Sequence, residues 1–255
     1  MCPKHILSKE YEKLYRNNLS EFINNLRWYE DENALTSDYS LFYPSIGKKF
    51  KDKPKLLVIG RALNGWGEEC KFSIKYRSWD DEKIAAFTKN VISFSLEEKR
   101  GECPMKWLTN TEKYKGIAKS SFWGVIKKYV TEELNISEEK YTEVIAWSNL
   151  CKIAPFKSGN PEGIAWNAQF KGSVALFKQE LIDLSPERVI LITDLFNWAQ
   201  YFLVAANIDF ELSDDRKGIV EAIAEYNGTK ILITSRPERK EWSVFSEKIA
   251  EYFKL

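Results

Sequence analysis

The chain has 255 residues, and its 38 lysine and arginine residues nearly balance its 37 aspartate and glutamate residues. This balance excludes a strongly basic nucleic-acid-binding protein, although a local basic face would still attract phosphates. No apolar run approaches the ~20 residues that a membrane span needs. The four cysteines form no CxxC pair and His5 is the single histidine, so we expect no zinc site. No signal peptide precedes the charged start, which predicts a cytoplasmic protein with reduced thiols.

Helices and strands alternate along the predicted chain. Helices are expected at 8–29, 81–96, 120–134, 165–184, from about 194, and at 241–253, with Ser8 and Asp194 as candidate caps of two of them. Strands are expected at 55–60, 143–147, 188–193 and 230–234, with an irregular aromatic segment at 38–47 and a hairpin or edge section at 208–226. Short strands separated by helices predict a parallel sheet between helix layers. We therefore expect a single three-layer αβα domain over 1–255, with a mostly parallel four-stranded sheet and an N-terminal helical extension over 1–50.

The first predicted strand ends in a glycine-rich loop. The strand is a continuous apolar run, which is typical of a strand that is buried on both faces. Gly60 then opens a loop with two more glycines, an asparagine and a tryptophan. In an open α/β sheet, ligands bind beyond the carboxyl ends of the strands. The loop is therefore a candidate binding segment, or else a plain turn that needs glycine for its backbone angles.

Two further loops follow strands at the same predicted edge. The three segments are GRALNG at 60–65, SNLCKIAP at 148–155 and SRPER at 235–239. Their order and content resemble the uracil-DNA glycosylase superfamily over residues 55–253. That family has a glycine-led first motif, a second motif of the form T/S-N-x-x-K-x-x-P, and a last loop of the His-Pro-Ser type. The resemblance implies the glycosylase-like fold and a hydrolase of DNA base excision, which cleaves an N-glycosidic bond with water and needs no metal or organic cofactor.

The resemblance also implies catalytic residues, although two family positions differ here. The family carries an acid or amide just after the first glycine to position the attacking water, and Arg61 stands there in this chain. That role falls to Asn64, or alternatively to Glu68 or Glu69. Arg236 replaces the family's histidine in the last loop. Its guanidinium could stabilise the departing base anion, contact a DNA phosphate, or simply pair with a nearby acid on the surface.

The base-binding residues implied by the resemblance are Gly60, Asn149 and an aromatic side chain. An asparagine carries the donors and the acceptor needed to read the Watson–Crick edge of a flipped base, although Asn149 could instead cap the end of its strand. Phe72 lies about where the family stacks a phenylalanine on the base, and Tyr43 is the rival. Either aromatic ring could equally be a core residue.

A basic rim would bind phosphates around this site. Lys152, Lys157 and Arg239 are its candidates together with Arg236, although charged residues at loop tips are often only solvated. The expected partner is DNA or RNA with a damaged or deaminated base. We expect the protein to be a monomer and not to bind membranes. A rival prediction is a binding module of the same fold that holds a base or nucleotide without cleaving it. A third is a protein-interaction domain that uses the aromatic segments 39–47 and 66–79.

Overall fold

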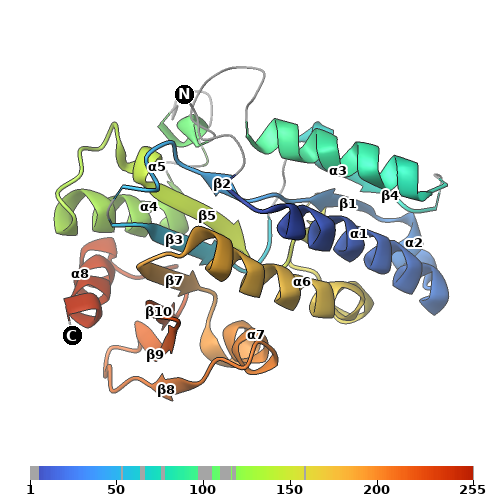
Figure 1. Cartoon of the computed structure of the whole chain (residues 1–255). Coiled ribbons are helices and arrows are strands. Elements are labelled where there is room, and N and C mark those ends of the chain that lie inside the picture. Colours follow the sequence, from blue (N-terminus) through green and yellow to red (C-terminus); the bar gives the residue numbers. More distant parts are fainter. Residues whose placement is uncertain are drawn as a thin grey trace.

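The computed structural model describes residues 6–52, 54–63, 67–75, 78–96, 105–109, 116, 119–157 and 159–254. Within these ranges the chain forms a seven-stranded sheet and a separate three-stranded sheet. Helices cover both faces of the larger sheet (Figure 1). No helix of the described ranges is both long enough and apolar enough to cross a bilayer.

The larger sheet has the order β2-β5-β3-β7-β10-β9-β8. Its four central strands are parallel: β5 (Ile145–Asn149), β3 (Leu56–Gly60), β7 (Arg188–Ile192) and β10 (Thr229–Thr234). The edges are antiparallel: β2 (Ser45–Ile46) on one side, then β9 (Val220–Tyr226) and β8 (Phe210–Leu212) on the other. The mostly parallel sheet is confirmed. The strand count of four is wrong, because three antiparallel strands extend the sheet at its edges.

The side chains of β3 alternate between two apolar clusters. Leu57 and Ile59 belong to the cluster under α1 (Lys9–Tyr29), α3 (Asp81–Ser95) and α6 (Gly163–Leu184). Leu56 and Val58 belong to the cluster under α4 (Ser121–Lys128), the π-helix η4 (Tyr129–Glu133) and α8 (Trp242–Lys254). A strand with helices on both faces buries every side chain, which explains the continuous apolar run in its sequence.

The remaining helices are short. They are α2 (Glu32–Thr36), α5 (Tyr141–Val144), α7 (Gln200–Ala205), the 3₁₀ turns η1 (Glu68–Cys70) and η2 (Lys106–Thr109), and the π-helix η5 (Leu195–Ala199).

The smaller sheet lies beyond the carboxyl edge of the larger one. It has the order β4-β1-β6, all antiparallel, with β4 (Lys71–Ser73), β1 (Asp38–Leu41) and β6 (Ile153–Pro155). Because β6 follows β5 after only a few residues, this sheet lies next to the carboxyl ends of the parallel strands. The aromatic segment 38–47, expected to be irregular, supplies both β1 and β2.

Helix α1 packs along α6 in the antiparallel direction. Ser8 is the N-cap that the sequence predicts: its Oγ accepts from Tyr11 N at 3.2 Å and donates to Asp183 near the end of α6 at 2.8 Å. Near the other end of α1, Asn25 Nδ2 donates to Ala168 O at 3.0 Å. The last turn of α1 therefore lies on the side where the parallel strands end.

Candidate functional site

The strand order creates a topological switch point between β3 and β7. From β3 the chain crosses to β5 on one side, whereas from β7 it continues to β10 on the other side. In open α/β sheets, ligands bind at such a point, beyond the carboxyl ends of the strands. The candidate site is therefore built from the segments that follow β3, β5, β7 and β10.

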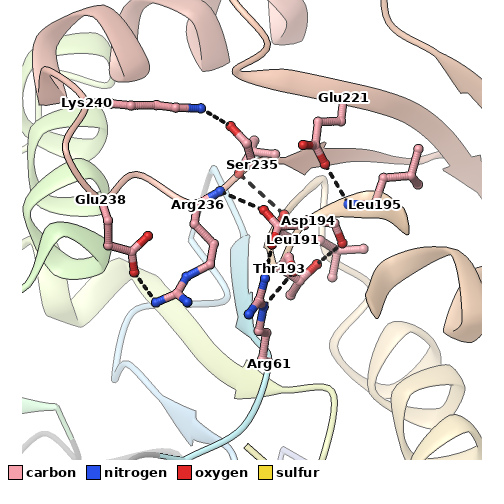
Figure 2. A network of polar contacts seen from close by, with 11 residues as sticks. Arg61, Leu191, Thr193, Asp194, Leu195, Glu221, Ser235, Arg236, Glu238 and Lys240 are labelled. Carbon is pink, nitrogen blue, oxygen red and sulfur yellow. Dashed lines mark hydrogen bonds and ion pairs between the residues drawn. The ribbon is translucent and has the colours of Figure 1, made fainter. Parts of the chain in front are cut away.

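Arg61, directly after β3, binds the residues that follow β7 (Figure 2). Its Nε donates to Thr193 O at 2.8 Å, and a terminal guanidinium nitrogen pairs with Asp194 Oδ2. The guanidinium carbon lies 5.5 Å from the centroid of the Trp198 ring. Burial and then the charge of the nearby Arg236 lower the pKa of Arg61. The residue after the glycine of the first motif is therefore a cation that joins two strand ends.

Asp194 connects the end of β7 to the segments after β3 and β10. Its Oδ1 accepts from Arg236 N at 3.0 Å, and its own backbone N donates to Thr234 O at 3.1 Å. Asp194 occupies the N-cap position of the following helix η5, as predicted, but its side chain makes no capping hydrogen bond. The carboxylate is bound to Arg61 and Arg236 instead. Asp194 also has a φ of 66°, and the π-helix η5 starts at the next residue. Such features are often found at functional sites.

The backbone of Asp194 provides a test of this geometry. We expect the free energy of unfolding of Asp194→Gly to exceed that of Asp194→Ala by about 1 kcal/mol. In urea titrations Asp194→Gly should therefore unfold at the higher urea concentration. Both variants lose the same carboxylate, but only glycine adopts a positive φ without a steric penalty. An Asp194→Ala variant as stable as Asp194→Gly would contradict the strained conformation.

Asn149 lies at the end of β5, directly beside Gly60 at the end of β3. The residue is 2% exposed, and its Nδ2 has no hydrogen-bond partner among the described residues. A Cβ atom on Gly60 would lie 2.6 Å from Asn149 Oδ1. Only a glycine thus leaves room for the Asn149 amide in this position. The structure brings these two predicted base-binding residues together.

Lys152 does not belong to a basic rim. Its side chain is 0% exposed and forms an ion pair of 2.8 Å with Glu180, which is also 0% exposed. The prediction that Lys152 binds phosphate is wrong, because the chain after β5 turns inward and places the lysine under α6. A sequence pattern gives no sign that a loop lysine meets an acid in a later helix.

Tyr43 and Phe72 are core residues. Tyr43 contacts Tyr11 and Tyr15 of α1 edge-on, and Phe72 packs against Tyr39. Their exposed fractions are 2% and 1%. The prediction that either ring stacks on a base is wrong, because neighbouring aromatic rings already cover their faces and edges.

The other predicted residues lie on the surface or outside the described part. Arg236 is half exposed, and its guanidinium pairs with Glu238. Glu68, Lys157 and Arg239 are exposed, so their predicted roles stay predictions. Asn64 lies outside the described residues. Two hydrogen bonds of Ser235 Oγ also hold the segment after β10. It accepts from Lys240 (Figure 2) and donates to Gly218 O at 2.7 Å.

Sequence reasoning missed Asp194 as part of the site. The available signal was an acid directly after the third parallel strand, at the edge where the other loops gather. No cluster of three or more histidine, cysteine, aspartate or glutamate side chains suited to a metal ion occurs among the described residues. Comparison of the sequence with models of known protein families finds no match, and comparison with curated proteins finds no significant match.

Proposed function

We propose that this chain is a uracil-DNA-glycosylase-like protein that binds a nucleobase extruded from DNA or RNA. One observation carries the proposal: Asn149, at the carboxyl edge of the sheet, holds a buried amide nitrogen that has no hydrogen-bond partner among the described residues. An unpaired buried donor costs about 1–3 kcal/mol, and a ligand acceptor would remove that cost. The O2 and O4 atoms of uracil are acceptors of this kind, and the amide oxygen of Asn149 can accept from N3–H.

The architecture supports the same proposal. The four parallel strands between two helix layers agree with the glycosylase-like fold that the motifs imply. The first and second motifs begin in the last residues of β3 and β5, and the last motif begins directly after β10, so all three begin at one edge of one sheet. We propose this fold family on these grounds.

In the proposed reaction, water attacks C1′ of the sugar while the bond from C1′ to the base nitrogen breaks. The bonding electrons leave with the base, which then takes up a proton, and the sugar gains a hydroxyl group. Glu68 or Asn64 would position the water. Arg236 would stabilise the negative charge on the departing base, once its guanidinium turns from Glu238 to the base.

A second candidate is a module that binds the base without hydrolysis. Its support is the state of the charged groups: Arg61 is paired with Asp194, Arg236 with Glu238, and Glu68 is exposed to solvent. In this function the Asn149 amide recognises the base, and the basic residues only contact the backbone of the nucleic acid.

The test measures base release and binding on single-stranded oligonucleotides with one central uracil, hypoxanthine or xanthine. We expect the wild-type protein to bind the uracil oligonucleotide and Asn149→Ala to bind it roughly 10- to 100-fold more weakly, since one oriented pair of hydrogen bonds is lost. Asn18→Ala is the matched control. Asn18 is also a buried asparagine with unpaired polar atoms, but it lies between α1 and α6.

The outcomes separate the two functions. Base release that is lost in Asn149→Ala and in Arg236→Ala, but retained in Asn18→Ala, supports the glycosylase. Uracil-dependent binding without release, again lost only in Asn149→Ala, supports the binding module. Equal binding of oligonucleotides with and without the modified base would contradict both functions.

A further inference from the structure

We infer that Lys152 is a positioning residue, which fixes the end of β5 so that the amide of Asn149 faces the base. This inference deepens the proposed function and rests on it for the identity of the ligand. The contacts that carry it lie wholly inside the protein, on the opposite face of β5 from the Asn149 amide.

All three N–H donors of Lys152 are used. Its Nζ donates to Ser148 Oγ at 2.9 Å, to the backbone oxygen of Asn149, and to Glu180 at 2.8 Å. Two of these three contacts hold consecutive residues at the point where β5 leaves the sheet. Because all its donors are engaged and it is fully buried, the Lys152 side chain is held in one conformation. Its hydrogen bonds therefore fix the positions of Ser148 and Asn149.

The two residues that Lys152 holds point in opposite directions. Side chains alternate along a strand, so the Ser148 hydroxyl faces Lys152 while the Asn149 amide lies on the other face. There a Cβ on Gly60 would meet both Asn149 and Phe122 of α4. Lys152 therefore contacts Asn149 only through its backbone oxygen, and within the described part of the chain Asn149 Nδ2 has no partner that a ligand would have to displace.

The counterion of Lys152 is fixed as well. Glu180 of α6 accepts from the hydroxyl of Tyr11 in α1 at 2.6 Å through the same carboxylate oxygen that meets Lys152. Burial, followed by the charge of Glu180, raises the pKa of Tyr11 well above its ordinary value, so the hydroxyl remains a donor. The end of β5 is thus attached through Lys152 to the α1–α6 pair.

A buried ion pair contributes little net stability, because apolar residues of the same size often do as well or better. Apolar residues could not orient the end of β5, since they have no hydrogen-bond donor for Asn149 O or Ser148 Oγ. The prediction that Lys152 binds a phosphate was wrong because the lysine lies inside the protein and not at its surface. Its contribution to base binding is indirect.

The test compares two variants that share one substitution. The triple variant Tyr11→Phe/Lys152→Met/Glu180→Met removes the ion pair without leaving a charge behind, and Tyr11→Phe alone keeps all three Lys152 contacts. The first readout is the side-chain amide signal of Asn149 in ¹⁵N-correlated NMR spectra without ligand, assigned by its loss in Asn149→Asp. The second is affinity for an oligonucleotide with 2′-fluoro-2′-deoxyuridine, whose glycosidic bond resists hydrolysis.

We expect the Asn149 signal to shift or broaden in the triple variant and to stay in place in Tyr11→Phe. The affinity of the triple variant should fall about tenfold, the equivalent of one misaligned hydrogen bond. Ser148→Ala, which removes one anchoring contact and no charge, should move the same signal even if the triple variant folds poorly. A folded triple variant with unchanged Asn149 signals would overturn the inference. Shifted signals in a protein that never binds uracil would uphold the positioning by Lys152 and refute the proposed function.

Discussion

Lys152→Met is expected to lower the free energy of unfolding by about 3–5 kcal/mol, which is the typical cost of removing one partner of a buried ion pair. The substitution leaves the carboxylate of Glu180, which is 0% exposed, with no counterion among the described residues. The measurement is urea-induced unfolding followed by tryptophan fluorescence and circular dichroism, with wild-type protein under the same conditions.

The control for this prediction removes the second charge too. In the triple variant Tyr11→Phe/Lys152→Met/Glu180→Met no buried charge remains, so we expect it to regain most of the lost stability. Lys128→Met is the control on the surface, because Lys128 pairs with the half-exposed Glu132 and such a pair contributes about 0–1 kcal/mol. A Lys152→Met variant no less stable than Lys128→Met would contradict the presence of a buried ion pair between Lys152 and Glu180.

Gly60→Ala is expected to reduce uracil binding roughly 10- to 100-fold and stability by about 1–3 kcal/mol. The added methyl group would overlap the amide oxygen of Asn149, since the two atoms would be 2.6 Å apart. Asn149 is buried, so its side chain can leave this position only by displacing its neighbours. Binding titrations and urea unfolding measure the two effects separately.

A double-mutant cycle identifies the cause of the effect. In the Asn149→Ala background the methyl group of Gly60→Ala no longer meets an amide, so its stability cost should largely disappear. Gly116→Ala is the matched control, because a Cβ there would meet no atom of the described residues within 4 Å. Additive effects of the Gly60 and Asn149 substitutions would show that the two side chains do not share this space.

The parallel core could be predicted from the sequence because local signals are strong there. The expected strand at 55–60 is observed as Leu56–Gly60, and the helix expected at 8–29 is observed as Lys9–Tyr29 with the cap Ser8. Apolar runs and caps are properties of neighbouring residues. The hairpin or edge section expected at 208–226 is observed as the antiparallel pair β8 and β9. The β2 edge was not predicted, since β2 has only two residues and is defined by its pairing with β5.

The candidate site was predicted less well because it depends on contacts between distant segments. Gly60 and Asn149 were found through their motifs. The pairing of Arg61 with Asp194 spans 133 residues, and it depends on a backbone conformation that no local pattern encodes. Phe72 was misassigned for a related reason: an aromatic residue after a loop has the same sequence pattern whether its ring meets a ligand or other rings.

The pairing of α1 with α6 has a consequence for synthesis of the chain. Ser8 and Asp183 are 175 residues apart, so the first helix leaves the ribosome roughly ten to thirty seconds before its partner is complete. During this time its apolar stripe, which includes Tyr15, Leu19 and Phe22, has no α6 to cover it. Nascent chains that stop before α6 would therefore expose this stripe and be prone to aggregate, whereas chains that extend through α6 can bury it.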